Sequence, residues 1–527
     1  MAKKIMIQGT MSNSGKSFVA AALCRILRQD GYSVAPFKSQ NMALNSYITK
    51  DGLEIGRAQA MQAEAAGIAP TVDMNPILLK PTSQMGSQVI VNGEVFGNLK
   101  AMDYYRRKTE FIPAVREAFE RLESQFDAIV LEGAGSPAEI NLRDNDIVNM
   151  GMAKIANAPV LLVGDIDRGG VFASLYGTVS LLEPEERARI KGLVINKFRG
   201  DVKILEPGLR MIEERLHIPV VGVIPMEQID LDDEDSLSDR LVRTKAQDGL
   251  DVAVIHLPHI SNFTDFNALE HYDGVSLRDV DRPEHLGQPE LILLPGTKNT
   301  MADLKWLRES GLEAMIWRLV EEQKVPVIGI CGGYQMLGEQ LSDPHGVEGE
   351  PGSTMRGMGL LAAETIFAAE KTRTRTEGMV MAAAGVYGQV TGQSVKGYEI
   401  HMGETFPAEA GSGLNGSQQA GAGQQPGNAS RADHSVTPAI CLADGRMDGF
   451  VRADGLVFGS YLHGLFDNLE FTGAILTRLA EKKGISLTAK AQSMEEYKES
   501  QYDKLADLVR QSLDMEAVYK IMEEYES

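Results

Sequence analysis

Residues 9–17 are the feature that most constrains the fold of this chain. They are Gly-Thr-Met-Ser-Asn-Ser-Gly-Lys-Ser, they directly follow the apolar run 4–8, and a helical pattern begins at once behind them. The order of strand, glycine-rich loop and helix is that of a phosphate-binding loop, with one residue more between the glycines than in the common form. Such a loop lies at the carboxyl edge of a parallel sheet. The residues around it are therefore expected to form an α/β domain.

Apolar strand patterns alternate with helical patterns through two stretches of the chain. For the first, residues 1–226, the alternation predicts a doubly wound parallel α/β sheet. The second, residues 250–472, alternates in the same way and predicts another α/β domain. The strand patterns lie at residues 4–8, 33–37, 128–131, 160–163, 192–195 and 220–224, and then at residues 251–255, 291–294, 325–330 and 456–461.

The remaining segments are predicted to connect or flank these domains. Residues 227–249 are acidic and are expected to form a solvated linker. Residues 473–527 are expected to form a C-terminal helical segment. Residues 407–437 are rich in Gly, Ser, Gln and Ala and have no apolar period, which predicts a disordered insertion at a loop tip. A chain of 527 residues is also too long for one hydrophobic core.

Charge and cysteine usage exclude several classes of protein. The formal net charge of −21 argues against a protein that binds nucleic acid or an anionic membrane. The three cysteines, Cys24, Cys331 and Cys441, have neither disulfide nor metal spacing, which is typical of a reducing compartment. No apolar stretch approaches the roughly 20 residues that span a bilayer. We therefore expect a cytoplasmic protein without a membrane or nucleic-acid partner; a homo-oligomer stays an open alternative.

Side chains in and near the phosphate loop predict a nucleotide site. Backbone N–H groups from Thr10 to Gly15 would cradle phosphates, and Lys16 would neutralise their charge. Ser17 is a ligand candidate for Mg²⁺. Lys38, after a strand pattern, is expected to meet the γ-phosphate or a carboxylate substrate.

Three further polar residues end strand patterns of the same predicted sheet. Glu132 directly follows the strand pattern 128–131, and glycines come shortly after it. We therefore expect it beside the phosphates as a Mg²⁺ ligand. Asp165 is a second metal candidate, with a helix N-cap as its alternative. Asn196 follows residues 192–195, where a nucleotide base would be bound.

A second site is predicted at Cys331, in the sequence Gly-Ile-Cys-Gly-Gly at residues 329–333. An apolar run precedes this cysteine and a helical pattern follows it, so the thiol would lie at a sharp strand-to-helix turn. A helix N-terminus favours thiolate over thiol. The N–H groups of Gly332 and Gly333 would lie near a developing oxyanion.

His463 is the candidate base for this thiol. It follows the strand pattern 456–461, in the sequence Gly-Ser-Tyr-Leu-His-Gly. Gly296, after the strand pattern 291–294, is a candidate second oxyanion donor. Glutamine amidotransferases use a cysteine and a histidine in this way: the thiol attacks the side-chain amide of glutamine, the histidine transfers the proton, and ammonia leaves.

Two resemblances to known families connect the predicted nucleotide site with the predicted Cys331 site. The shifted phosphate loop, Lys38 and the Glu-Gly-Ala-Gly sequence at residues 132–135 resemble the dethiobiotin-synthetase-like branch of the P-loop ATPases, whose members activate a carboxylate by phosphorylating it. Over almost its whole length the chain resembles the cobyric acid synthase family of glutamine-dependent amidotransferases. The matching stretches are residues 8–17, 36–42, 74–81, 164–172, 329–333, 397–403 and 461–464.

The resemblance implies a substrate and a reaction. It implies amidation of the b, d, e and g carboxylates of adenosylcobyrinic acid a,c-diamide, with one ATP, one glutamine and Mg²⁺ in each step, to give adenosylcobyric acid for cobalamin biosynthesis. An enzyme that amidates another polycarboxylate, such as cobyrinic acid a,c-diamide synthase, is an alternative. A nucleotide-dependent partitioning protein is another, although Cys331 with His463 argues against it.

One position departs from the wider amidotransferase pattern. Those enzymes usually have a glutamate two residues after the catalytic histidine, and this chain has Leu465 there. The site is therefore expected to be a Cys331–His463 dyad whose imidazole another group orients. Glu399 is a candidate for that contact, and a purely structural role of Glu399 and His401 is the alternative.

Overall fold

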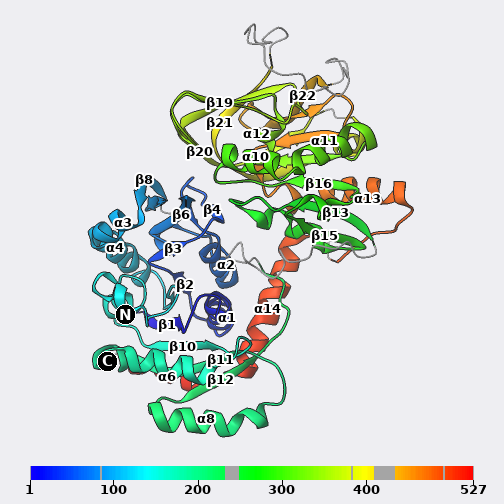
Figure 1. Cartoon of the computed structure of the whole chain (residues 1–527). Helices are drawn as coiled ribbons and strands as arrows, with labels where there is room; N and C mark the ends of the chain where they lie inside the picture. The colour runs from blue at the N-terminus through cyan, green and yellow to red at the C-terminus, as the bar shows by residue number, and fades with distance from the viewer. Residues whose placement is uncertain are drawn as a thin grey trace. The chain divides into compact units, whose positions relative to one another are not determined.

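The computed structural model describes residues 2–83, 86–231, 249–381, 384–408, 434–490 and 493–525 (Figure 1). Most of the predicted linker 227–249 and of the predicted insertion 407–437 lies outside these ranges. The chain divides into two compact units, Met1–Asp235 with Glu495–Ser527, and Ser236–Met494. The predicted C-terminal helical segment 473–527 thus does not form a separate unit: its residues up to Met494 belong to the second unit and the residues from Glu495 on belong to the first.

The first unit is built on a six-stranded parallel sheet with the order β12-β11-β10-β1-β9-β2. Its elements are β1 (Lys3–Gly9), α1 (Lys16–Gln29), β2 (Val34–Phe37), β3 (Gln40–Met42), β4 (Ser46–Ile48), β5 (Glu54–Gly56), α2 (Arg57–Ala66), β6 (Ile77–Ser83), β7 (Gly86–Val91), β8 (Glu94–Lys100), α3 (Ala101–Arg107), α4 (Ile112–Glu123), β9 (Ala128–Glu132), η3 (Ile140–Asn145), α5 (Met150–Ile155), β10 (Val160–Asp165), α6 (Val171–Leu181), α7 (Pro184–Arg187), β11 (Ile190–Phe198), α8 (Val202–Leu216), β12 (Val220–Pro225), α14 (Met494–Ser512) and α15 (Met515–Glu524).

Helices cover both faces of this sheet, as the predicted doubly wound fold requires. Successive side chains of a strand point to opposite faces, and Ile5 and Ile7 of β1 accordingly belong to one apolar cluster while Met6 belongs to another. The cluster of Ile5 contains side chains of α1, α14 and α15; the cluster of Met6 contains side chains of α4, α5 and α6. The last helices of the chain therefore complete the core around its first strand.

An insertion of β3 to β8 separates β2 from α3. Its main part is a four-stranded sheet with the order β3-β6-β7-β8, and β4 pairs with β5 as a hairpin. Buried polar groups hold the insertion together: the Lys80 ammonium donates to Glu54 at 2.8 Å and to the Ser46 hydroxyl at 3.0 Å. Because the insertion starts directly after Lys38, it lies at the carboxyl edge of the main sheet.

The second unit has a twelve-stranded mixed sheet. Its elements are β13 (Leu250–Ile255), η5 (Phe263–His271), β14 (Tyr272–Asp273), β15 (Val275–Val280), α9 (Pro283–Leu286), β16 (Leu291–Leu294), α10 (Thr300–Glu309), α11 (Leu312–Gln323), β17 (Val327–Ile330), α12 (Gly332–Leu337), β18 (Gln340–Asp343), β19 (Ser353–Arg356), β20 (Ala363–Val380), η6 (Gly385–Val390), β21 (Ser394–Pro407), β22 (Val436–Leu442), β23 (Met447–Arg452), β24 (Val457–Ser460), β25 (Leu462–His463), η8 (Leu465–Asp467), α13 (Leu469–Lys483) and β26 (Thr488–Ala489).

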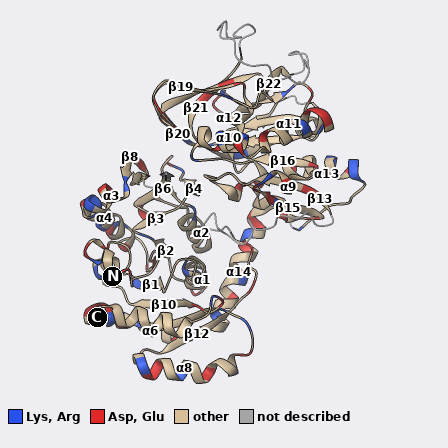
Figure 2. Ribbon diagram, viewed as in Figure 1, with Lys and Arg blue, Asp and Glu red and all other residues tan. Residues whose placement is uncertain are grey.

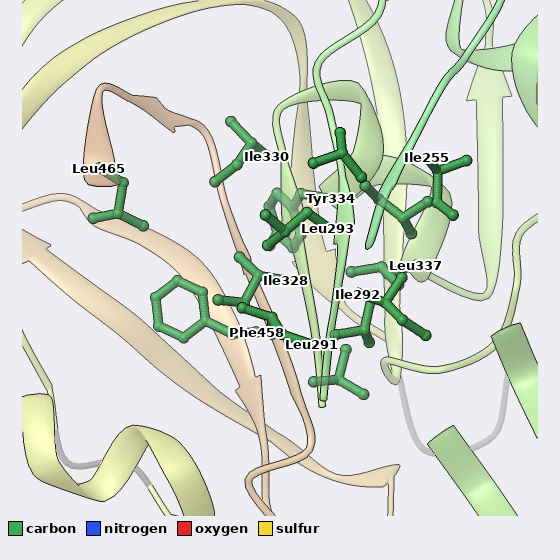
Figure 3. Packing of buried hydrophobic residues seen from close by; sticks show 14 of the residues in the cluster. Ile255, Leu291, Ile292, Leu293, Ile328, Ile330, Tyr334, Leu337, Phe458 and Leu465 are labelled. Carbon is green, nitrogen blue, oxygen red and sulfur yellow. The ribbon is translucent and has the colours of Figure 1, made fainter. Parts of the chain in front are cut away.

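Strand order brings distant residues of this unit to one edge. The strands β15, β13, β16, β17 and β24 are neighbours in this order and run parallel. Their carboxyl ends therefore share an edge, and Ile330 at the end of β17 is paired with Ser460 at the end of β24. Behind that edge, Ile292, Ile328 and Phe458 pack in one core with Tyr334 and Leu337 of α12 (Figure 3).

Among the described residues, no helix is both long and apolar enough to cross a membrane.

The predicted fold class is confirmed by two α/β units. Each presents the carboxyl edge of a parallel sheet, and each edge carries one of the predicted sites.

Candidate functional site

Cys331 is the residue between β17 and α12, and its backbone is strained. It has φ of 52° and ψ of −110°, a combination that L-residues rarely adopt and that is concentrated at functional sites. Glycines are required at the two positions after it, because a Cβ on Gly332 would lie 2.5 Å from the Thr297 Cγ2 and one on Gly333 would overlap the Leu294 carbonyl. The turn thus presents a nearly buried thiol at the start of a helix.

His463 lies fully buried beside this thiol, and Asp265 holds it. The Nδ1 of His463 is 2.7 Å from Oδ2 of Asp265, and the N–H of Gly464 donates to Oδ1 of the same carboxylate at 3.0 Å. Burial alone lowers the pKa of His463, but the charge and hydrogen bond of Asp265 and the hydrogen bond to Cys331 outweigh it and raise the pKa to about 10. The imidazole can therefore hold a proton taken from the thiol.

Two other side chains lie against the imidazole. The Nδ2 of Asn262 is 3.5 Å from Nε2 of His463. The ring of Tyr398, in β21, stacks on the imidazole at a centroid distance of 5.2 Å and an angle of 18°. With Nδ1 committed to Asp265, Nε2 is the nitrogen left to exchange a proton with Cys331.

The loop after β16 brings Gly296 to the same place. A Cβ on Gly296 would lie 3.0 Å from Cε1 of His463, so this backbone borders the imidazole directly. The loop after β13 is held to it, because the N–H of Ser261 donates to the Gly296 carbonyl at 2.9 Å. The buried carboxylate of Asp303 accepts from the Thr297 hydroxyl at 2.5 Å and from the His259 N–H at 3.1 Å. Both loops are thereby fixed against each other.

Glu399 does not orient His463, so one of the two roles considered for it is wrong. Its carboxylate is bound by the Arg446 guanidinium, at 2.6 Å for Nη2 and 3.2 Å for Nη1, and lies 3.6 Å from Nε2 of His401. Burial raises the pKa of Glu399, but the hydrogen bonds of His401 and Arg446 outweigh it and lower the pKa. Its position fits the structural alternative.

In the first unit, the phosphate loop connects β1 to α1 and contains buried polar groups without partners. The Oγ1 of Thr10 and the Oγ of Ser14 are buried and have no hydrogen-bond partner among the described residues. The Lys16 ammonium donates to the carbonyls of Met11 at 3.0 Å and Gly135 at 3.3 Å. Buried hydroxyls that lack partners are costly. An anion in the loop would satisfy them, which is the arrangement expected of a phosphate site.

Asn196 and Lys197 brace this loop from the end of β11. The Asn196 amide donates to the Ser14 carbonyl at 3.0 Å, and Gly15, with φ of 90°, leaves room for it. The Lys197 ammonium donates to the Asn13 carbonyl at 2.6 Å and to Asp165 at 2.9 Å. The amide of Asn196 therefore faces the loop backbone.

Glu132 is the centre of a buried polar cluster beside the loop. Its carboxylate accepts from the Ser17 hydroxyl at 2.8 Å, from the Lys38 ammonium at 2.9 Å and from the Gln62 amide at 2.5 Å. Three predicted residues, Ser17, Lys38 and Glu132, are thus joined in one network. Among the described residues no group of three or more His, Cys, Asp or Glu side chains is placed so that it could hold a metal ion by itself. A P-loop Mg²⁺ needs only one or two carboxylates beside the phosphates.

Asp165 lies at the end of β10 and is already engaged. Its Oδ2 is bound by Lys197 at 2.9 Å and its Oδ1 accepts from the Asp167 N–H at 2.9 Å. The residue before α6 is Gly170, so the alternative of Asp165 as a helix N-cap is wrong. Asp165 remains a candidate metal ligand that would have to exchange its lysine partner.

Sequence reasoning missed Asp265, Asn262 and Gln62. Asp265 is 198 residues from His463, and a carboxylate in an irregular segment gives no periodic signal. One signal was present: the segment follows the strand pattern 251–255, so its side chains reach the edge that Cys331 and His463 occupy. Using it would have required the order of the strands.

Comparison with known proteins gives two domain families and close full-length relatives. Residues 251–471 match the CobB/CobQ-like glutamine amidotransferase domain, and residues 5–238 match the CobQ/CobB/MinD/ParA nucleotide binding domain. The chain is 54% identical to a cobyric acid synthase of Lachnoclostridium phytofermentans, over 99% of this chain and 100% of that protein. It is 54% identical to one of Ruminiclostridium cellulolyticum and 50% identical to one of Alkaliphilus metalliredigens, with at least 98% of each chain covered.

Proposed function

This chain belongs to the cobyric acid synthase family, and on that premise we propose that it amidates the b, d, e and g carboxylates of adenosylcobyrinic acid a,c-diamide to give adenosylcobyric acid. The class of the activity is that of a glutamine-hydrolysing carbon–nitrogen ligase of cobalamin biosynthesis. The four positions, the acyl phosphate intermediate and the roles of single residues are the proposed part. That the protein works in the cytoplasm stays a prediction.

The second unit would release ammonia from glutamine. The Cys331 thiol gives its proton to Nε2 of His463, and the sulfur attacks the side-chain amide carbon of glutamine. The backbone N–H groups of Gly332 and Gly333 stabilise the oxyanion that forms. His463 returns the proton to the leaving nitrogen, and a thioester forms as ammonia leaves. Water then attacks the thioester with His463 as the base, which gives glutamate and the free thiol.

Asp265 has the orienting role in this scheme. Its carboxylate holds Nδ1 of His463, so Nε2 faces the sulfur, and its charge stabilises the imidazolium that forms. The geometry that supports this role is the 2.7 Å contact inside a buried site. The dyad expected from the sequence would then act as a triad whose acid comes from η5, the 3₁₀ helix after β13.

The first unit would activate the carboxylate. A carboxylate oxygen of the corrinoid attacks the γ-phosphorus of ATP, and ADP leaves; ammonia then attacks the acyl carbon, phosphate leaves and a proton is released. Lys16 would stabilise the charge that builds up on the phosphates. Lys38 would bind the γ-phosphate or the attacking carboxylate after it exchanges its contact with Glu132.

The residues of the first unit fit the phosphates and Mg²⁺ that this step needs. The hydroxyls of Thr10 and Ser14, which have no hydrogen-bond partner among the described residues, fit bound phosphate oxygens. Ser17 and Glu132, whose oxygens are 2.8 Å apart, would hold Mg²⁺, which neutralises phosphate charge when it is bound. Asp165 is proposed as a further ligand.

The observation that carries the proposal is the strained Cys331 next to a buried His463 whose Nδ1 a carboxylate holds. Neither a partitioning switch nor a simple kinase requires this arrangement. The test is mass spectrometry of the product formed from the a,c-diamide with ATP, Mg²⁺ and glutamine labelled with ¹⁵N in its side-chain amide. We expect a tetra-amidated product with one label in each new amide. A product that stops after two new amides, or an unchanged a,c-diamide, would overturn the proposal.

A further inference from the structure

Several large apolar side chains of the first unit are exposed on three segments that follow the carboxyl ends of β2 and β9. On the described part of the chain these side chains are between 40% and 61% exposed. They are Met42 in β3, Val95 and Phe96 in β8, Met102 in α3, and Ile140 and Leu142 in η3. Clustered exposed apolar groups of this kind mark interaction surfaces, whereas scattered ones do not.

Hydrogen bonds hold these segments together. The Tyr104 hydroxyl of α3 donates to the side-chain oxygen of Gln40, in β3, at 2.6 Å. The Asn145 amide of η3 donates to the Tyr105 carbonyl of α3 at 3.3 Å. Because β3 begins two residues after Lys38, α3 is tied to the segment that carries the proposed carboxylate-activating lysine. We call the exposed parts of β3, β8, α3 and η3 the edge surface.

The stretch from the end of β8 through α3 to Lys108 is the basic part of the edge surface in an acidic protein, although β8 and η3 also contain the acidic residues Glu94 and Asp144. Of the nine residues 100–108, four are Lys or Arg and one is acidic, although the chain has a net charge of −21. Arg106 and Lys100 are exposed, and no carboxylate of the described residues lies within ion-pair distance of either one. The Arg107 guanidinium lies 5.0 Å from the centroid of the Phe96 ring and also pairs with Glu110. Figure 2 marks the basic residues of α3 in blue.

We propose that the edge surface binds the corrinoid substrate, an inference that rests on the function proposed above. A corrinoid is a broad macrocycle with apolar faces and a rim of side-chain carboxylates. Met102 and Phe96 would contact a face of the ring, while Arg106 and Lys100 would bind carboxylates that are waiting to be amidated. The carboxylate being activated would extend toward Lys38. The match is one of charge and of apolar area together.

The proposal has a consequence for the series of reactions. Each amidation removes one negative charge from the rim, so the attraction to Arg106 and Lys100 decreases with every step. The a,c-diamide should therefore bind more tightly than the fully amidated product, and added salt should reduce that difference. Product release would become easier as the substrate is completed.

The decisive variant is Arg106→Glu in the full chain. We expect the Kd of the a,c-diamide, measured by calorimetry without ATP, and its KM to rise by roughly 10-fold. The Kd of the fully amidated product should change by less than about 2-fold. The KM of ATP and the glutaminase rate should stay as in the wild type. Met102→Ser is expected to weaken both corrinoids alike, since it removes contact with the ring rather than charge.

Matched controls lie on α8, which has the same pair of residue types. Arg210 and Met211 are exposed, and Arg210→Glu and Met211→Ser should leave corrinoid binding unchanged. If Arg106→Glu binds the a,c-diamide as the wild type does, the edge surface is not the corrinoid site. If the wild type amidates no corrinoid at all, the proposed function fails instead, so the two failures are distinguishable.

Discussion

The two candidate sites differ in how complete they are within the folded chain. In the second unit, Cys331, His463 and Asp265 already have the contacts that their proposed chemistry needs, and the Asp265 carboxylate offsets the charge of a protonated His463. In the first unit, Lys16 is bound by two carbonyls, while the hydroxyls of Thr10 and Ser14 find no hydrogen-bond partner in the described part of the chain. The first site is arranged for a ligand that it does not itself supply.

The chemistry explains this difference. A nucleophile and its base must be held at hydrogen-bond distance at all times, because the reaction begins with a proton transfer between them. A phosphate site gains its charge balance from the nucleotide and its metal, and its own lysines use temporary partners before binding. Variants of the second site should therefore affect one nitrogen source only, whereas variants of the first should affect every amidation.

The largest difference between glutamine-driven and ammonia-driven amidation is expected for Cys331→Ala. Glutamine-driven amidation should fall by about 10⁴-fold or more, because no thioester can form, whereas amidation with added ammonia should persist. Product formation with each nitrogen source is the measurement. Cys441→Ala, which removes a thiol outside the site, is the control and should keep both activities. If ammonia does not rescue Cys331→Ala, the two sites do not divide the reaction as proposed.

Lys16→Ala should remove both activities, by roughly 10³-fold, because it weakens stabilisation of the transferred phosphoryl group. Glutamine hydrolysis measured as glutamate release should decrease much less than amidation does. Lys203→Ala, at an exposed lysine at the start of α8, serves as the control. Substantial ammonia-dependent product from Lys16→Ala would contradict the role of the phosphate loop.

Asp265→Asn tests the residue that the sequence did not reveal. Glutaminase activity should fall by about 10²- to 10³-fold, because the amide favours the wrong tautomer of His463 and cannot stabilise the imidazolium. Ammonia-dependent amidation should stay near that of the wild type. Glu399→Gln is the matched control, since it removes a buried carboxylate of the same unit and should lower glutaminase activity by less than about 10-fold. Equal losses in the two variants would leave Asp265 without a special role.

The smallest effect concerns stability and its pH dependence. The pKa of His463 is raised from 6.5 to about 10, so its protonation stabilises the folded state fully below pH 6.5, and this stabilisation is lost as the pH rises toward 10. Asp265→Asn removes the charge that raises the pKa. In urea unfolding, the wild type should exceed the variant in unfolding free energy most at acidic pH, and the excess should shrink toward pH 10. A pH-independent difference would mean that Asp265 does not set this pKa.

The local parts of both sites were predictable because they are built from neighbouring residues. The phosphate loop, the Cys331 turn and the strands before them are fixed by glycines, apolar runs and helix starts within about ten residues. Ser17, Lys38 and Glu132 could be assigned to one edge because parallel strands end together. The polar contacts among them, and Gln62 as a further partner, could not be assigned, since they depend on how α2 packs.

Tertiary structure alone decided which acid serves His463. Glu399 and Asp265 are both carboxylates of the second unit, and the sequence offered Glu399 as a candidate with a purely structural role as the alternative. The strand order places β13 next to β16 and β16 next to β17, so Asp265 reaches the imidazole, while Arg446 captures Glu399. The sequence by itself identified Cys331 and His463 as the candidate nucleophile and base, the phosphate loop as the candidate nucleotide site, and the family. Contacts between residues far apart in the chain, which no local pattern encodes, decided the rest: Asp265 and His463 are 198 positions apart, and Arg25 of α1 and Asp503 of α14 are 478 positions apart.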